Sequence, residues 1–272
     1  MITLDSNWVA GFIDGDGSFG LENSQGFYRP ILSISQNDPQ LLNKIKDFFG
    51  CGTVTRKSKK AWHYRCRSAR QFQDFIIPKL GKAPFQTIKQ FQYELICEQA
   101  LPLLLKTQKD DADLKELENL DLRILLSRKD VSYVNTNLEM SLNWFLGFFE
   151  AEGNFYVKIR TTDPVDLRIA FKVTQKNKPL LKKIQSFFGF GLIQVERPEI
   201  WKYNVEGIKN VTTKAYSIFR NHPLKGKKNL ERVKFLSIIR ILLKNGHKTT
   251  QGLEKIQKIQ NWRGVFNKHP NE

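Results

Sequence analysis

The stretch that decides the fold is residues 8–19, WVAGFIDGDGSF, because the chain repeats it as WFLGFFEAEGNF at residues 144–155. A tryptophan, two glycines, two acids and the closing phenylalanine recur at one offset (144 − 8 = 136). The polar residues 5–7 (DSN) are good helix N-caps, and glycine is the usual helix stop. The repeat therefore predicts two helices that pack against each other, each ending in an acid, Asp16 or Glu152.

The repetition continues well beyond this stretch, at an offset of 139 (175 − 36 = 139). The matched positions include Gln36 and Gln175, Trp62 and Trp201, and Lys89 and Lys228. The second copy thus gains three residues (139 − 136 = 3), which we expect in a longer hairpin loop around residues 161–164. The repeated unit runs over residues 6–126 and again over 142–265. We predict an N-terminal half-domain at 1–126, a linker at 127–141 and a C-terminal half-domain at 142–272.

Within each unit the hydrophobic pattern predicts the order α-β-β-α-β-β-α-α. In the second copy, apolar residues at 155, 157 and 159 alternate with outward-facing polar ones, which is typical of a half-buried antiparallel hairpin. Further helices are expected at 39–49, from 68, and at 86–106, 110–126, 228–245 and 249–261, with a basic turn at 56–60. The predicted fold class is α+β, with two tandem αββαββα(α) units related by a pseudo-twofold axis and one antiparallel sheet in each.

Charge is the strongest bulk signal, since 44 Lys and Arg residues against 27 Asp and Glu give a net charge of +17. An excess this large favours a polyanionic partner over a merely solvated surface. No apolar run reaches the ~18 to 20 residues needed to span a bilayer, and the N-terminus lacks a signal-peptide pattern, so we expect no membrane partner. Three cysteines and four histidines are scattered without metal-ligand spacing, which argues against a zinc site or a disulfide framework.

The acids at the ends of the repeated helices indicate a metal site. A helix C-terminus carries unsatisfied carbonyls and about half a negative charge, so an acid there is unfavourable. If the helices pack side by side, Asp16 and Glu152 converge, and a divalent cation such as Mg²⁺ relieves their repulsion. Acids that only cap backbone amides are the alternative. Asp14 and Glu150 stand two residues earlier and point elsewhere, so we expect for them a structural role or a role in supporting the metal-binding acids.

Two further matched pairs are candidates for the catalytic shell around these acids. Gln36 and Gln175 would orient a water or a phosphate, unless they are only polar residues near the N-caps of the helices that follow. Lys89 and Lys228 would stabilise developing negative charge or assist water activation, unless they are ordinary solvated lysines.

Residues 9–17 (VAGFIDGDG) and 145–153 (FLGFFEAEG) resemble the name motif of the LAGLIDADG homing endonucleases, in their single-chain form with two motifs. The resemblance continues through the matched glutamines and lysines and covers nearly the whole chain. It implies a saddle whose two sheets lie along the major groove of a long DNA duplex. It also implies metal-dependent hydrolysis of both strands that leaves 3′ overhangs, by a monomer encoded in an intron of an organelle, a mitochondrion or a chloroplast.

Carried over by position, the resemblance makes Asp16 and Glu152 the metal-binding acids, with the backbone carbonyls of Gly15 and Ala151 beside them. It implies two or more Mg²⁺ ions between the acids, with Mn²⁺ or Ca²⁺ substituting in binding. The glutamines and lysines would form the surrounding shell. The use of Asp in one motif and Glu in the other departs from symmetry, and we expect the two strands to react at unequal rates.

The outward side chains of the predicted strands and of the basic turn are the expected DNA contacts. They are Arg29, Ser33, Lys57, Lys59, Lys60, His63, Arg65, Arg67, Tyr156, Lys158, Arg160, Arg168, Lys172 and Lys202. Basic residues there would neutralise phosphates, and polar ones would read base edges. Two alternatives share the fold: an intron maturase that binds RNA to assist splicing, and a non-cleaving DNA-binding regulator. The presence of both acids favours cleavage.

Overall fold

The structure is a computed structural model that describes residues 4–81, 85–160 and 166–262. Helix α1 (Ser6–Asp16) begins after the N-cap Asp5, and helix α8 (Leu142–Glu152) begins after the N-cap Ser141. Both helices are followed by a glycine, as predicted. The acids Asp16 and Glu152 are the last residues of the helices, as predicted.

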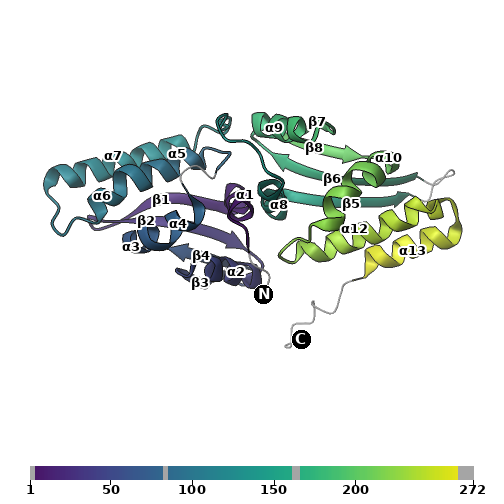
Figure 1. The fold of residues 1–272 in the computed structure, drawn as a ribbon, viewed down its shortest axis with the longest axis horizontal. Coiled ribbons are helices and arrows are strands. Elements are labelled where there is room, and N and C mark those ends of the chain that lie inside the picture. The colour runs from purple at the N-terminus through teal and green to yellow at the C-terminus, as the bar shows by residue number, and fades with distance from the viewer. Residues whose placement is uncertain (1–3, 82–84, 161–165, 263–272) are drawn as a thin grey trace.

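Helices α1 and α8 lie side by side at the centre of the molecule, with one sheet on either side (Figure 1). Their backbones approach closely because glycine occupies the crossing. A Cβ atom placed on Gly11 would lie 1.9 Å from the carbonyl oxygen of Trp144, and one on Gly147 would lie 1.9 Å from that of Trp8. Real Cβ atoms cannot come so near to backbone oxygen, so the glycines are what permits the predicted packing of the two helices.

The N-terminal sheet is antiparallel, with the strand order β1-β2-β4-β3. Its strands are β1 (Gly17–Ser24), β2 (Phe27–Gln36), β3 (Thr53–Ser58) and β4 (Ala61–Cys66), and helix α2 (Pro39–Phe49) connects β2 to β3. One face supplies fully buried core residues, among them Phe19, Leu32, Ile34 and Tyr64. Helices α2, α5 and α7 contact this sheet, and the other face carries polar and basic side chains.

The C-terminal sheet repeats this topology as β5-β6-β8-β7. Its strands are β5 (Gly153–Arg160), β6 (Asp166–Gln175), β7 (Leu192–Arg197) and β8 (Ile200–Glu206), with α9 (Lys178–Phe188) between β6 and β7. The register is also equivalent, because the first strand pairs Gly17 with Ile34 in one sheet and Gly153 with Val173 in the other. The predicted α+β fold with two repeated units is confirmed. The longer loop predicted around residues 161–164 lies outside the described residues.

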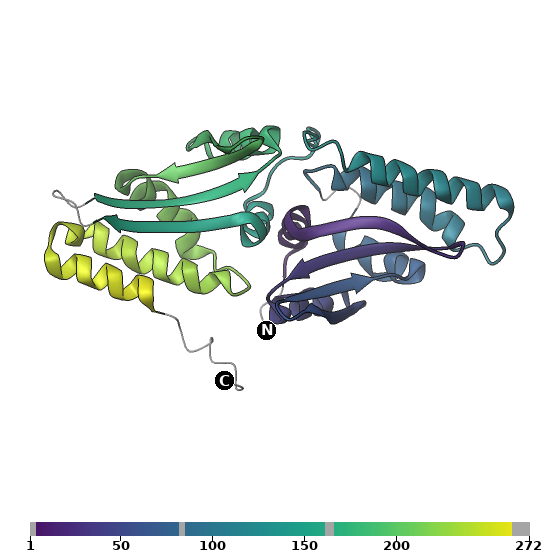
Figure 2. The ribbon, with the colours of Figure 1, turned by 180° about the vertical axis from the view of Figure 1, so that it is seen from behind.

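The remaining helices lie beside the two sheets, one group in each half (Figures 1 and 2). In the first half they are α3 (Ala69–Gln71), α4 (Ile77–Leu80), α5 (Lys89–Glu94), α6 (Leu101–Leu104) and α7 (Asp111–Ser127). In the second half they are α10 (Ile208–Asn210), α11 (Tyr216–Asn221), α12 (Lys228–Leu243) and α13 (Thr250–Asn261). Single π-helical stretches, 72–76, 95–100 and 211–215, join α3 to α4, α5 to α6 and α10 to α11. No helix among the described residues has the length and apolar character that crossing a bilayer requires.

Two predicted boundaries were wrong. The helix expected from Gln86 begins only at Lys89, and the backbone N–H groups of Gln86 and Thr87 bind the Asp14 carboxylate instead of an acceptor in their own segment. The basic turn expected at 56–60 is mostly strand, since β3 continues to Ser58 through an irregularity in its pairing with β4. The turn itself is therefore only Lys59 and Lys60.

Candidate active site

The ends of α1 and α8 bring the two predicted metal-binding acids together. A Cβ atom placed on Gly15 would lie 2.3 Å from the Ala151 Cβ and 3.2 Å from the Glu152 Cγ, so the last turns of the helices touch. Burial raises the pKa of Asp16. Burial also raises the pKa of Glu152, and the neighbouring Asp16 carboxylate raises it further. Two desolvated carboxylates repel each other, and the partial negative charge of the two helix C-termini adds to the repulsion. A bound cation would offset this negative charge.

The matched glutamines lie directly at these acids. The Gln36 side-chain amide donates a hydrogen bond to the Asp16 carboxylate, and the Gln175 side chain donates one to Glu152. Neither caps the helix that follows it. Asp38 caps α2 by accepting from the Gln40 N–H at 3.1 Å, and Asn177 caps α9. The glutamines therefore orient the two acids, and the N-cap interpretation does not hold for them.

The matched lysines lie beneath the same helix ends and are not solvated surface residues. The Lys89 Nζ donates to the carbonyl oxygens of Ile13 at 2.8 Å, Asp14 at 2.5 Å and Gly15 at 3.4 Å. Burial lowers the pKa of Lys89, against the attraction of Asp14, Asp16 and Glu152. The ammonium group thus satisfies carbonyls that a helix C-terminus leaves free and offsets part of the negative charge there.

Lys228 repeats this arrangement in the second half. Its Nζ donates to the carbonyl oxygens of Phe149 at 3.0 Å, Ala151 at 3.3 Å and Gly153 at 2.7 Å. Burial lowers the pKa of Lys228 as well, opposed by Glu150, Asp16 and Glu152. Two cationic side chains and two acids therefore surround one point between the halves.

The residues at this point fit a divalent cation. The candidate ligands are the carboxylates of Asp16 and Glu152 and the carbonyls of Gly15 and Ala151, all hard oxygen donors of the kind Mg²⁺ and Ca²⁺ prefer. Within the described ranges, no three or more His, Cys, Asp and Glu side chains gather into a metal site. Any ion held by the two acids therefore needs further oxygen ligands from water or from a bound phosphate.

The acids two residues earlier hold the loops that carry the lysines. Asp14 is buried and accepts from the Gln86 N–H at 2.7 Å and from the Thr87 N–H at 3.3 Å. Glu150 is buried and accepts from the Lys225 N–H at 2.7 Å. These contacts match the structural role expected for both acids. The loops themselves were not identified from the sequence, because nothing in their local pattern indicates contact with a helix more than 70 residues away.

The outer faces of the two sheets carry the predicted DNA contacts. In the first sheet Ser33 and Thr53 both pair with Arg65, so these side chains lie in one row across the strands. In the second sheet Lys158 pairs with Arg168. The described side chains among the predicted contacts otherwise fall on the same two faces or, for Lys59 and Lys60, in the turn at the edge.

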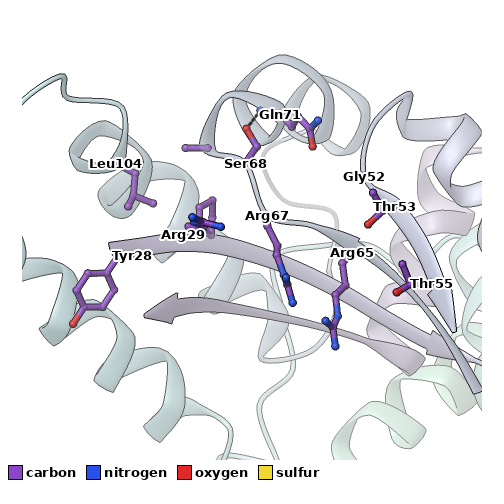
Figure 3. Close-up of a pocket in the computed structure, with 12 residues that line it drawn as sticks. Tyr28, Arg29, Gly52, Thr53, Thr55, Arg65, Arg67, Ser68, Gln71 and Leu104 are labelled. Atoms are coloured by element: carbon purple, nitrogen blue, oxygen red, sulfur yellow. Dashed lines mark hydrogen bonds between the residues drawn. The ribbon is translucent and has the colours of Figure 1, made fainter. Parts of the chain in front are cut away.

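A groove of about 700 Å³ lies on the first sheet (Figure 3). Arg29, Arg65 and Arg67 line it together with Thr53 and Thr55. Among the described residues, the buried Arg65 Nε has no hydrogen-bond acceptor. The three arginines make the groove basic, which suits an anionic partner.

Several predicted contacts are less available than the sequence suggested. His63 is only 6% exposed, and burial followed by the charges of Arg65, Lys57 and Arg67 lowers its pKa. Ion pairs occupy others: Arg67 with Glu22 at 3.1 Å, and Lys172 and Lys202 with Glu196 at 3.4 and 2.8 Å. These exposed pairs are weak and can exchange for a phosphate. The side chain of Arg160 lies outside the described part of the chain.

Comparison with known proteins gives a consistent match. The sequence model of one family, LAGLIDADG endonuclease, matches residues 9–100 and again residues 145–239. The probable intron-encoded endonuclease Cox1-I1b of Schizosaccharomyces pombe is 28% identical over 85% of this chain and 58% of its own length. The probable intron-encoded endonuclease 2 of Neurospora crassa is 24% identical over 95% of this chain and 65% of its own length. The chain thus spans less than two thirds of each of these relatives.

Solved structures share the architecture. The structure of I-SmaMI bound to an uncleaved DNA target in the presence of calcium ions superposes with a TM-score of 0.81. The two chains are 22% identical, and the match covers 94% of this chain and 98% of that one. At this identity the likeness establishes a common fold.

Proposed function

The chain belongs to the LAGLIDADG endonuclease family, and from that membership we propose that it is a site-specific homing endonuclease that hydrolyses both strands of a long DNA duplex. The observation that carries the proposal is the meeting of Asp16 and Glu152 at the ends of α1 and α8, one acid from each half. A duplex has two strands related by an approximate twofold axis. A site built from two equivalent halves can address both strands at once.

In the proposed mechanism Asp16 and Glu152 would hold divalent ions, with the carbonyls of Gly15 and Ala151 as further ligands. Such ions, when bound, neutralise charge on the attacking and leaving oxygens of a phosphodiester. We propose Mg²⁺ as the working ion, with Mn²⁺ or Ca²⁺ able to bind. Gln36 and Gln175 hold the acids in place, and their hydrogen bonds to Asp16 and Glu152 support this role.

Lys89 and Lys228 supply positive charge under the reacting group and exchange their carbonyl contacts for anionic oxygen as the reaction proceeds. Assisting water activation is the other role proposed for them: burial lowers the pKa of both lysines, and a lysine in its neutral form can accept a proton from water. Hydrolysis of both strands would leave 3′ overhangs. The half-domains 1–126 and 142–272, joined by 127–141, each serve one half of the target.

DNA in the major groove is the proposed partner, held along the outer faces of both sheets. The row of Ser33, Arg65 and Thr53 and the basic pair Lys158 and Arg168 support this placement. We propose that one chain acts as a monomer, since both halves of the site lie within it. An organellar intron as the source of the chain accords with the intron-encoded fungal relatives.

A selection from random sequences tests this function and identifies the target in the same step. The full chain is incubated with a randomised duplex library, with Mg²⁺ or with EDTA, and the cleaved ends are sequenced. We expect enrichment of one long sequence, cut in both strands only with the metal. Enrichment by binding without any cleavage would favour the regulator, and stimulated splicing of an intron RNA without DNA cleavage would favour the maturase.

A further inference from the structure

The two equivalent buried acids Asp14 and Glu150 (150 − 14 = 136) are held differently, although the halves are otherwise matched. Asp14 accepts a hydrogen bond from the other half, from the Trp144 indole Nε1 at 2.9 Å. The equivalent indole, Trp8, makes no such bond to Glu150. Within the described part of the chain, Trp8 Nε1 is a buried donor without any acceptor.

The loop that Asp14 holds also has a feature that its counterpart lacks. The Thr87 hydroxyl donates to the Asp14 carboxylate and accepts from the Lys89 N–H at 3.3 Å. The equivalent residue is Gly226 (226 − 87 = 139), which has no side chain to make these bonds. A Cβ there would lie 2.8 Å from Leu41 Cδ2 and 3.1 Å from Glu150 Oε1, so a larger residue would have to displace these side chains.

One lysine of the opposite half supports each loop: Lys183 Nζ donates to Gln86 Oε1 at 2.5 Å, and its equivalent Lys44 (183 − 44 = 139) contacts the second loop. The second loop also has a contact from the opposite half that its counterpart lacks. The Asp38 carboxylate accepts from the Lys227 N–H at 2.9 Å, and the Lys44 Nζ donates to the Lys225 carbonyl at 2.6 Å. Asp38 has Asn177 as its equivalent (177 − 38 = 139), and Asn177 instead donates to the Tyr133 carbonyl of the connecting segment at 2.8 Å. Asn177 thus contacts the connecting segment, whereas Asp38 contacts the second loop across the interface. A further contact across the interface on the side of the first loop is the bond from the Trp144 indole to Asp14.

We propose that Trp144 is a positioning residue for Lys89, acting across the interface through Asp14 and Thr87, and that Trp8 has no equivalent task. The contacts form an unbroken series: the indole holds the Asp14 carboxylate, the carboxylate holds the loop at Gln86 and Thr87, and Thr87 holds the start of α5. Lys89 is the first residue of α5 and reaches back to the end of α1.

This inference rests on the proposed endonuclease function and adds an asymmetry to it. The C-terminal half would control the lysine of the N-terminal half, while the reverse link through an indole is missing. Small displacements of a group near a reacting centre are costly: about 1 Å can reduce a rate about a hundredfold. Loss of the Trp144 bond should therefore slow one strand of the duplex more than the other.

The test measures single-turnover cleavage of each strand of a selected target, labelled on both strands. Lys89→Met first identifies the strand that depends on Lys89. We expect Trp144→Phe to slow that strand about tenfold and the other less than about twofold, with unchanged DNA affinity. Thr87→Val, which removes the hydroxyl while keeping the shape, should give the same pattern. When Lys89→Met is already present, Trp144→Phe should slow cleavage of that strand by less than a further factor of about two, because both substitutions act through Lys89.

Trp8→Phe is the matched control, since it trims the same side chain at the equivalent buried position and should affect neither strand by more than about twofold. Equal slowing of both strands by Trp144→Phe, or the same result with Trp8→Phe, would overturn the proposal.

Amide hydrogen exchange provides a readout that needs no cleavage. Exchange at Gln86 and Thr87 should accelerate in Trp144→Phe, whereas exchange at Lys225 and Gly226 should stay unchanged in Trp8→Phe. If the wild-type chain cuts no duplex, the proposed function is wrong. The exchange result then still decides the positioning link: unchanged exchange at Gln86 and Thr87 contradicts it.

Discussion

At the scale of single residues, a spacing of two along α1 separates two different tasks. Asp14 faces the interior and accepts hydrogen bonds from Gln86, Thr87 and Trp144. Asp16 ends the helix beside Glu152 and, among the described residues, receives one hydrogen bond, from Gln36. A carboxylate with all its acceptor positions used is structural, whereas one with free positions at a helix end is available for a ligand.

Glu152→Gln should stabilise the metal-free protein at neutral pH. Burial, and then Asp16, raises the pKa of Glu152 above its usual 4.5, so its charged form costs stability. This cost is complete above the folded-state pKa and disappears as the pH falls below 4.5. In EDTA at pH 7 we expect the variant to have a Tm about 2 to 4 °C higher than the wild type, with the gap closing near pH 4.

Divalent metal should reverse this ranking. Added Mg²⁺ or Ca²⁺ should raise the Tm of the wild type in calorimetry, because an ion that binds only the folded state stabilises it. The Glu152→Gln variant should respond much less. A variant no more stable than the wild type in EDTA, or equally stabilised by metal, would contradict a charged metal-binding role for Glu152.

At the scale of elements, the crossing of α1 and α8 joins the two halves. Gly147→Ala should destabilise the protein by about 3 kcal/mol, since the new Cβ would lie 1.9 Å from the Trp8 carbonyl and would push the helices apart. Urea unfolding measures the change. It should be accompanied by loss of metal binding, because Asp16 and Glu152 separate with the helices. A fully stable variant would show that the crossing is looser than described.

The sheets supply the second prediction at this scale. Arg65 lies on β4 opposite Ser33 and Thr53 and lines the groove of the first sheet. Arg65→Ala should weaken binding of the selected duplex about tenfold or more, measured in Ca²⁺ to prevent cutting, and should reduce the salt dependence if the contact is to phosphate.

Lys115→Ala is the matched control for charge, because it removes one positive charge from the exposed surface of α7, away from the sheet. It should change the affinity less than about twofold. Equal effects of the two substitutions would mean that DNA binding reflects the net charge of +17 and not a defined face.

At the scale of the whole molecule, the duplication made most of the architecture predictable. Residues related by the offsets of 136 and 139 occupy equivalent positions in the two sheets. Gly17 pairs with Ile34 in the first sheet, and their counterparts Gly153 and Val173 pair in the second. Alternation in β5 and β6 identified the outward faces correctly. The meeting of the two acids could also be predicted, because the repeated motif and the small residues at the helix crossing are visible in short stretches of sequence.

What the sequence could not predict depends on contacts between distant residues. The segment before α5 is held by hydrogen bonds from Gln86 and Thr87 to Asp14, over 70 residues earlier. The burial of Lys89 against α1, and the bond from Trp144 to Asp14, are likewise long-range. Local periodicity carries no information about such partners. Departures from the repeat, such as Thr87 against Gly226, were the available signal that the halves differ.

The central claim is that one metal-dependent site, built from one acid of each half, cuts both strands. The most direct measurement is cleavage of the selected duplex by the wild type, Asp16→Asn and Glu152→Gln in Mg²⁺, with binding measured in parallel. We predict that either substitution reduces double-strand cleavage about a hundredfold or more while the DNA affinity stays within about threefold. Full double-strand cleavage by either variant would contradict the shared site.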